Sequence, residues 1–289
     1  GTLLISGGGV EETYAQKHDV MFRWDDVSTG IVTDRLELTV YAGALKINEM
    51  AFFDADGKLL PVKLINPTEG QAKLFDEQDT VPDEPSYFNG MYFDELYHGR
   101  TAYEHLHNLT PFENSHPPLG KILIMIGVAI FGMCPFGWRI MGALFGIGML
   151  PIFYGFGKRL FKNSNFALLA TGLFAFDFMH FTQTRIATVD VYAVFFILLM
   201  YYFMYRYMQA DFFGDFKKTL KPLALGGLFF GLGAASKWIC IYAGAGLAVL
   251  LFGALNARYR TYRRVMREGN TTEKAIVEVP CLVDRNGVQ

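Results

Sequence analysis

Cysteine is scarce in this sequence: the 289 residues include three, Cys134, Cys240 and Cys281. They lie far apart and form neither a Cys-x-x-Cys pair nor the His/Cys spacing of a zinc site. Cys134 and Cys240 fall within apolar runs, where a free cysteine behaves as a small buried hydrophobic residue. The sequence therefore predicts no structural disulfide and no zinc centre.

A complete calcium-binding loop is also missing. The segment Asp54-Ala55-Asp56-Gly57 resembles the start of such a loop but lacks the remaining ligand positions. Asp and Gly supply the backbone conformations of a tight turn, and apolar runs flank this one on both sides. A hairpin turn is therefore the preferred interpretation, and a metal site there is the alternative.

An initiating methionine and a secretory signal peptide of the usual form are absent as well. The chain opens with "GTLLISGGGV", which is typical of the middle of a domain. We therefore expect the sequence to be a fragment of a longer protein.

Charge is divided unevenly along the chain. Residues 1–90 contain 7 Lys and Arg against 16 Asp and Glu, whereas residues 91–289 contain 19 against 12. Apolar residues make up 52% of the chain, above the ~45–50% usual for soluble domains. An acidic front half is thus joined to a basic, apolar back half.

The acidic half shows the alternation of β-strands. From about residue 21 to 66, "RLELTVYAG" and "INEMAFFDADGKLLPVKLI" place apolar residues with a period of two, which predicts an antiparallel β-sandwich. "LKINEMAFFDADGKLLPV" resembles the closing strands of a discoidin-like, carbohydrate-binding sandwich. Residues 67–90 are acidic and marked by Pro and Gly, which predicts a linker.

The basic half is typical of a membrane protein. Five apolar segments approach the ~17–25 residues that cross ~30 Å of hydrocarbon, although the fourth is short. They are residues 138–156, 166–182, 191–208, 223–235 and 239–255. Buried helices of a soluble protein are the alternative, which five successive segments disfavour.

Basic residues give these spans an orientation. Lys and Arg cluster after the first, third and fifth segments, so the positive-inside rule places those loops in the cytoplasm. Residues 119–133 form a shorter apolar run, and we expect an interfacial or re-entrant helix there. If this run spanned the membrane instead, the stretch before it would lie in the cytoplasm.

With an interfacial helix, the unusual polar groups share the outer face of the membrane. Ionisable residues near lipid are costly unless paired or hydrated, so such a cluster indicates a functional site. Arg and Lys bind phosphate, and a carboxylate takes a proton from an incoming hydroxyl. The pattern fits a sugar linked through phosphate to a lipid. The residues are Asp94, Glu95, His116, Lys121, Arg139, His180, Arg185, Asp190, Lys237 and Trp238.

Each of these residues also has a structural alternative. Asp94 and Glu95 are also typical of the start of a helix. His116 is also typical of a turn, and Asp190 could cap the N-terminus of a helix. Arg139 and Arg185 fit interfacial anchors whose side chains reach toward headgroups. Trp next to Lys is common at membrane interfaces. His98, His105 and His107 have helical spacing, with a metal site as a remote alternative.

Five motifs carry a family resemblance in this order and spacing. They are "FDELYHGR", "HPPLGK", "FGMCPFGWRIMGALFG", "FDFMHFTQTRIATVDVYAVFF" and "GLGAASKW". Together they resemble the dolichyl-phosphate-mannose–protein mannosyltransferase family, membrane glycosyltransferases of the GT-C architecture. The likeness covers residues 87–242.

The resemblance implies an inverting transfer of mannose from a polyprenyl phosphate to Ser or Thr of a protein. It implies Asp94 as the catalytic base, with Glu95 supporting it or binding the acceptor, and no metal or other cofactor. It also implies that Arg139 and Arg185 bind the donor phosphate, and that His116 and Lys121 shape the site. The family's first membrane helix, its later helices and the eukaryotic β-trefoil insert are not visible in this chain.

The sequence thus predicts a mixed architecture: a polytopic α-helical membrane protein preceded by an antiparallel β-sandwich. Membrane lipids, the lipid-linked sugar and the acceptor protein are the expected partners, and nucleic acid is not. Two functional alternatives remain: sugar transfer to a lipid or cell-wall glycan, and a non-catalytic membrane protein that displays a carbohydrate-binding sandwich. The expected parts are 1–88 (sandwich and linker), 89–137 (loop and interfacial helix), 138–257 (membrane helices) and 258–289 (basic tail).

Overall fold

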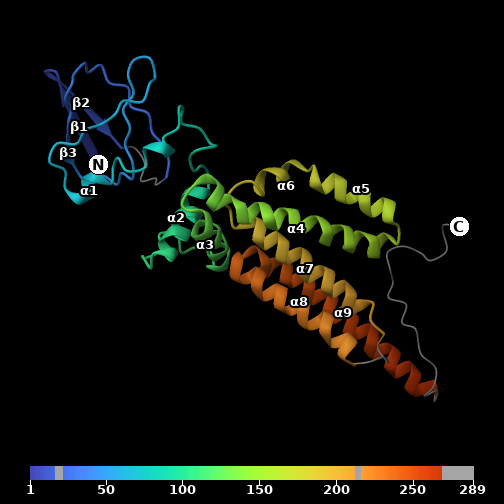
Figure 1. Cartoon of the computed structure of the whole chain (residues 1–289). Coiled ribbons are helices and arrows are strands. Elements are labelled where there is room, and N and C mark those ends of the chain that lie inside the picture. The colour runs from blue at the N-terminus through green and yellow to red at the C-terminus, as the bar shows by residue number, and fades with distance from the viewer. Residues whose placement is uncertain (17–21, 212–215, 269–289) are drawn as a thin grey trace. The chain divides into compact units, whose positions relative to one another are not determined.

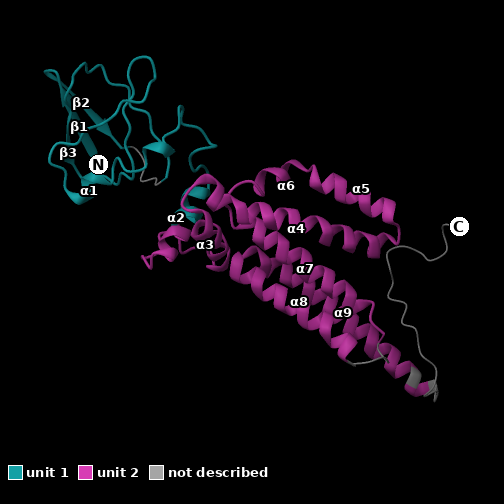
Figure 2. Ribbon diagram, in the orientation of Figure 1, with its two compact units in different colours: residues 1–100 teal, residues 101–289 magenta. Residues whose placement is uncertain are grey.

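A computed structural model describes residues 1–16, 22–211 and 216–268 of the chain. The chain divides into two compact units, Gly1–Arg100 and Thr101–Gln289 (Figure 2).

The first unit contains one antiparallel sheet. Its strands are β1 (Thr2–Gly7), β2 (Val10–Ala15) and β3 (Glu37–Ala42), in the order β2-β1-β3 (Figure 1). β1 and β2 are joined by Gly8 and Gly9, with φ of 58° and 82°. Two-residue hairpin turns require such positive φ angles, which glycine adopts without steric cost. The opening segment is therefore a hairpin that its sequence pattern did not reveal.

The β-structure predicted for residues 21–66 is confirmed only in part. "RLELTVYAG" forms β3, and Asp54 accepts hydrogen bonds from the backbone N–H groups of Asp56 and Lys58, at 3.0 and 2.9 Å, as a turn requires. The runs that flank this turn pair at a single bridge, Phe53–Leu59. Pro61 has no N–H to continue the ladder. Among the described residues there is one three-stranded sheet and no second sheet facing it.

Residues 67–90 are more ordered than the predicted linker. They contain the helix α1 (Glu69–Ala72) and the 3-10 turn η1 (Gln78–Thr80). The Met50 N–H donates to the Leu74 carbonyl at 2.8 Å, and the Gln78 amide donates to the Met50 carbonyl at 2.8 Å. This segment therefore folds against the chain that precedes it.

The remaining helices belong mainly to the second unit. α2 (Glu95–Leu106) crosses the division between the units. The others are α3 (Leu119–Phe131), α4 (Pro135–Phe161), α5 (Ser164–Ala175), α6 (Phe178–Gln183), α7 (Asp190–Met208), α8 (Phe216–Ser236) and α9 (Ile239–Glu268).

Within the described residues, three helices are long and apolar enough to cross a membrane: Pro135–Phe161, Asp190–Met208 and Ile239–Arg264. The fold is thus mostly helical, with membrane-spanning candidates after a small antiparallel sheet, as the sequence predicts. The total of five spans stays a prediction.

The predicted span at residues 166–182 is broken, and the one predicted at residues 223–235 starts earlier. Residues 166–182 are divided into α5 and α6, because Asp177 accepts a hydrogen bond from the His180 N–H at 3.0 Å and begins a new helix. α8 starts seven residues before the predicted residue 223, in a Lys-rich turn. α3 has 13 residues, about 20 Å, which is too short to cross the hydrocarbon core. Its interfacial position stays a prediction.

Side-chain contacts give the directions of the helices. α4 and α7 run parallel, since Phe145 contacts Tyr192 and, further along both helices, Arg159 contacts Tyr202. α5 and α6 together run back along α4. A Cβ atom on Gly146 would lie 2.4 Å from the Thr184 side chain, so only glycine permits this approach.

The last two helices complete the bundle. α8 packs antiparallel to α7, and α9 runs parallel to α7, with Tyr201 bonded to the Ala243 carbonyl and Arg258 to the Tyr207 carbonyl. The starts of α7 and α9, the end of α8 and residues 111–121 form what we call the polar end. The ends of α4 and α7 form the basic end.

Cys134 and Cys240 are both free. Cys240 is fully buried, with its thiol 3.7 Å from the Ala193 carbonyl, as expected of a small core residue. Cys281 lies outside the described residues.

Candidate functional site

A buried lysine organises the loop before α3. The Lys121 side chain is only 2% exposed, and its Nζ lies 2.6 Å from Glu113 Oε2. The same ammonium donates to the backbone carbonyls of Glu113, at 2.8 Å, and His116, at 2.9 Å. Since an ammonium has three N–H donors, this geometry uses all of them. Lys121 therefore clamps the loop and has no donor left for a phosphate.

Glu113 is the acceptor at the centre of this loop. Its Oε1 accepts hydrogen bonds from the N–H of Ser115 at 2.7 Å and the N–H of His116 at 3.0 Å, and the Ser115 hydroxyl also donates to it. Burial by itself raises the pKa of Glu113. Hydrogen bonds from Lys121, Ser115 and His116 outweigh burial and hold that pKa well below its usual range.

The predicted residue His116 belongs to the same cluster. Its Nδ1 lies 3.2 Å from Glu113 Oε1 and 3.0 Å from the Ser115 hydroxyl. The ring is half-buried. His116 thus shapes the loop together with Lys121, while its Nε2 is not engaged by these contacts.

The loop is also held from α2. The Phe112 N–H donates to Glu104 Oε2 at 2.6 Å, and the Glu113 N–H donates to the Thr101 hydroxyl at 3.1 Å. Thr101 and Glu104 lie one helical turn apart on one face of α2. Backbone donors of the loop are therefore satisfied by buried side chains of this helix.

A second lysine–carboxylate pair lies at the start of α7. Lys237 Nζ is 2.7 Å from Asp190 Oδ1 and 2.8 Å from Oδ2. The two side chains are 22% and 36% exposed, so this pair is far more accessible than the Lys121 pair. Two donors of the Lys237 ammonium point to Asp190, and within the described ranges no side chain or carbonyl takes the third.

Two contacts join the pairs at the polar end. The Trp238 indole N–H donates to the Ser115 carbonyl at 2.8 Å, so the residue after Lys237 contacts the loop that Lys121 clamps. Gly120 packs on α7, where an added Cβ would lie 2.7 Å from Val189 Cγ1. Backbone proximity therefore brings Lys121, Asp190 and Lys237 to one end of the bundle, as the sequence predicts.

The two predicted arginines lie at the same end. Arg185 follows α6 and is exposed, with its guanidinium carbon 4.7 Å from the Phe181 ring centroid. In the described part of the chain the Arg185 guanidinium forms no hydrogen bond or ion pair. Arg139 is half-buried in the first turns of α4, one turn before Gly142, where an added Cβ would lie 3.3 Å from the Ile186 carbonyl. Arg185 is thus the most available cation of this end.

Asp94 and Glu95 lie in the first unit, at the start of α2. The Asp94 carbonyl accepts the N–H groups of Tyr97 and His98 at 3.1 and 3.0 Å, so the pair begins a helix, as its structural alternative expects. Glu95 is fully buried, and its Oε2 accepts the Tyr92 N–H at 3.3 Å. Asp94 is half-buried, and its carboxylate has no hydrogen-bond partner within the described ranges. Their catalytic role stays a prediction.

The histidines do not form a metal centre in the part of the chain that the structure describes, where no group of three or more His, Cys, Asp or Glu has the geometry to hold an ion. His98 is buried, and the His107 ring lies 4.2 Å from that of Tyr103. His180 is half-buried, 4.3 Å from the Phe174 ring. The His107 and His180 rings therefore pack against aromatic neighbours.

Three contributors to this end, Glu113, Thr101 and Glu104, were not among the predicted site residues. Glu113 lies three residues before His116 and eight before Lys121, and an acid so near an unusual lysine is a usable signal. Thr101 and Glu104 sit on a helix whose sequence gave no indication that they would bind a loop. The spacing of residues in the sequence does not predict such contacts, because they form only when the loop packs on the helix.

Comparisons with known proteins agree with the motifs. Residues 131–266 match the family described as dolichyl-phosphate-mannose-protein mannosyltransferase. This region contains Arg139, Arg185, Asp190 and Lys237. The clamp residues Glu113 and Lys121 precede it.

Proteins named polyprenol-phosphate-mannose–protein mannosyltransferase are similar to this chain. The one from Mycobacterium tuberculosis is 30% identical over 185 residues, which are 56% of this chain and 34% of that protein. The one from Mycolicibacterium smegmatis is 29% identical over 56% of this chain and 35% of that protein. The one from Corynebacterium glutamicum is 35% identical over 28% of this chain and 16% of that protein.

The chain thus spans about a third of the length of the mycobacterial relatives that it matches. The family resemblance predicted from the motifs is confirmed. The resemblance lies in residues 131–266, where the model of the dolichyl-phosphate-mannose-protein mannosyltransferase family matches this chain.

Proposed function

We propose that the full-length protein carrying this chain transfers mannose from a polyprenyl phosphate to Ser or Thr hydroxyls of proteins. The observation that carries this proposal is the family domain at residues 131–266, with its cations at the polar end of the bundle. Relatives named for this reaction support it. Three helices that are able to span a membrane suit a donor with a lipid tail.

Arg185 and Lys237 are the proposed ligands of the donor phosphate, and Arg139 is proposed as a third. Arg185 is exposed and its guanidinium is available for a bidentate contact with phosphate oxygens. Lys237 keeps one ammonium donor after binding Asp190. Asp190 therefore holds the Lys237 ammonium in place and leaves one of its N–H donors for the phosphate.

Lys121 and His116 have a different proposed role. Because the Lys121 donors are used within the loop, Lys121 positions residues 113–116 and does not bind the donor. Through the Ser115 carbonyl this loop also fixes Trp238, next to Lys237. The clamp formed by Lys121 and Glu113 thus helps to hold Trp238 in place, and with it the neighbouring Lys237, a proposed phosphate ligand.

Asp94 is the proposed general base. Its carboxylate removes the proton of the acceptor hydroxyl, whose oxygen attacks the anomeric carbon of mannose. The bond between that carbon and the phosphate oxygen breaks, and the phosphate leaves with the bonding electrons. Attack opposite the leaving group inverts the anomeric configuration. Glu95 supports Asp94 from the first turn of α2, and the reaction as proposed requires no metal.

The polar end faces the extracytoplasmic side in this proposal. The basic end carries Lys158, Arg159 and Lys162 after α4, and basic residues favour the cytoplasmic side. A single-cysteine variant at exposed Glu84 should react with an impermeant thiol reagent in intact cells, and one at Lys162 only after permeabilisation. The opposite labelling pattern would reject this orientation without touching the proposed chemistry.

The transfer itself is tested with radiolabelled polyprenyl-phosphate mannose and membranes that contain the full-length protein. We expect label in the protein fraction, reduced by about 10²–10⁴-fold in Asp94→Asn, since general bases contribute that much. Asp56→Asn, an exposed aspartate in the turn of the first unit, is the matched control and should keep full activity.

Other outcomes would contradict the proposal in distinct ways. Label found only in lipid or glycan would move the acceptor to another class. Full transfer by Asp94→Asn would reject the assigned base while keeping the reaction. Absence of transfer to any acceptor, with glycan binding intact, would favour a non-catalytic display protein.

A further inference from the structure

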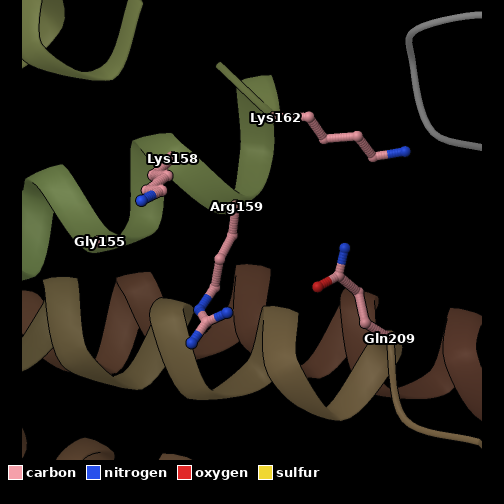
Figure 3. Close-up of a pocket in the computed structure, with 5 residues that line it drawn as sticks. All are labelled: Gly155, Lys158, Arg159, Lys162 and Gln209. Atoms are coloured by element: carbon pink, nitrogen blue, oxygen red, sulfur yellow. The ribbon is translucent and has the colours of Figure 1, made fainter. Parts of the chain in front are cut away.

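The basic end contains a cavity that the proposed transfer does not use. Its volume is about 530 Å³, and Gly155, Lys158, Arg159, Lys162 and Gln209 line it (Figure 3). Ligand sites in proteins have volumes of about 300–1,000 Å³. Lys158 follows Gly146 by roughly 12 residues, or about 18 Å along α4, so this cavity is separate from the polar end.

The charged residues that line this cavity are all basic. Lys158, Arg159 and Lys162 lie within about one helical turn, and none of the lining residues is acidic. No carboxylate within the described ranges pairs with any of the three. Arg206 adds a further positive charge, with its guanidinium carbon 5.9 Å from the Tyr202 ring centroid. An anion bound here would relieve the repulsion among these cations.

Tyrosines of α7 hold the wall of the cavity in place. The Arg159 Nε donates to the Tyr202 hydroxyl at 3.1 Å, and the Tyr205 hydroxyl donates to the Arg159 carbonyl at 3.3 Å. The Gln209 amide donates to the Tyr205 hydroxyl at 2.8 Å. This network fixes the Arg159 guanidinium through Nε alone. Its two terminal nitrogens have no hydrogen bond in the described part of the chain and suit a phosphate.

The residues around the cavity favour the phosphate of a lipid over a free phosphate ion as its ligand. α4 has 27 residues, about 40 Å, so its last turns extend beyond ~30 Å of hydrocarbon into the headgroup layer. Leu160 and Phe161 stand between Arg159 and Lys162 in the sequence and are each 50% exposed. A soluble anion would leave these apolar side chains uncovered, whereas the acyl chains of a lipid would cover them.

We propose that this cavity binds the headgroup phosphate of an anionic phospholipid. Arg159 contacts the phosphate oxygens through its terminal nitrogens, and Lys158 and Lys162 neutralise the remaining charge. The acyl chains lie against Leu160 and Phe161. Binding here joins the ends of α4 and α7 through a lipid of the leaflet at the basic end, and it does not depend on the proposed transfer.

The test uses the full-length protein in phosphatidylcholine nanodiscs, titrated with phosphatidylglycerol, with bound lipid counted by native mass spectrometry. The double variant K158Q/K162Q should weaken phosphatidylglycerol binding roughly thirtyfold, since each basic residue contributes about fivefold near an anionic headgroup. The matched control K218Q/K221Q removes two lysines from the start of α8, outside the cavity, and should bind as the unchanged protein does.

A second variant with a smaller change tests whether weaker lipid binding results from misfolding. Tyr202→Phe removes the hydroxyl that orients Arg159 but keeps all charges, and we expect severalfold weaker lipid binding with an unchanged melting temperature in phosphatidylcholine. Unchanged binding in both cavity variants would overturn the proposal. Equal loss in K218Q/K221Q would do the same, since it would indicate general surface attraction. Inorganic phosphate that displaces phosphatidylglycerol at equal concentration would assign the cavity to free anions.

Discussion

The lysines at the two ends of the helical bundle differ in their ion pairing. At the polar end, Lys121 and Lys237 each contact a carboxylate. At the basic end, Lys158, Arg159 and Lys162 contact none among the described residues. A paired cation is fixed in position at the cost of part of its binding capacity, whereas an unpaired cation keeps that capacity and attracts anions. Paired lysines therefore hold a fixed geometry, whereas the unpaired cations are suited to binding anions.

The polar end shows the same difference on a smaller scale. Lys121 is buried and uses all three donors, whereas Lys237 is partly exposed and keeps one. Burial therefore distinguishes a structural lysine from a proposed ligand, although both form ion pairs.

Breaking the buried pair should have the largest effect. Lys121→Met leaves the Glu113 carboxylate without its cation, and we expect the free energy of unfolding to fall by about 3–5 kcal/mol. Thermal unfolding of the full-length protein in detergent measures it. The double variant Lys121→Met/Glu113→Gln should recover most of the loss, because it removes the uncompensated charge. No recovery would mean that the carboxylate is not what makes the single variant unstable.

Acidification should weaken the same clamp at low pH only. The pKa of Glu113 is lower in the folded protein than the usual ~4.3 of an unfolded chain, so its contribution to stability is complete above that value. The contribution is lost as the pH falls below about 4, when the unfolded chain binds a proton first. Melting temperatures between pH 3 and 7 should therefore decline more steeply in the unchanged protein than in Glu113→Gln. Parallel curves would contradict this assignment.

The exposed pair should matter more for transfer than for folding. Lys237→Gln should lower the free energy of unfolding by about 1 kcal/mol or less, since partly exposed pairs contribute little. It should reduce transfer about tenfold through loss of a charged contact with the donor phosphate. Initial rates at varied donor concentration measure this, with Lys221→Gln at the other end of α8 as the control. A fall in stability as large as that of Lys121→Met would remove the distinction between the two lysines.

The smallest effect is expected for the neutral residue of the basic end. Gln209→Ala removes one hydrogen bond at an exposed position, so unfolding should change by about 0.5 kcal/mol and phosphatidylglycerol binding by less than threefold. Native mass spectrometry and thermal unfolding measure both quantities. A loss as large as that of K158Q/K162Q would mean that shape rather than charge governs the cavity.

Much of the site could be predicted from residue types because lipid makes polar groups conspicuous. Arg139, Arg185, Asp190 and Lys237 stand out against apolar runs, and the helix directions bring them to one end. Glu113 was less visible because it lies in a polar loop, where an acid is ordinary. The β1–β2 hairpin was missed because its glycines obscure the alternation of its short strands.

The sequence alone determined the class of the protein through apolar segments of membrane length, basic residues after alternate segments, and ordered motifs that resemble a known family. These properties depend on hydrophobicity and local order along the chain, which need no folded contacts. Only the tertiary structure decided the separate roles of Lys121 and Lys237. Burial, the number of satisfied donors and the distance to a carboxylate arise when segments remote in sequence pack together. The cavity at the basic end has the same origin, since it needs the ends of two helices to meet.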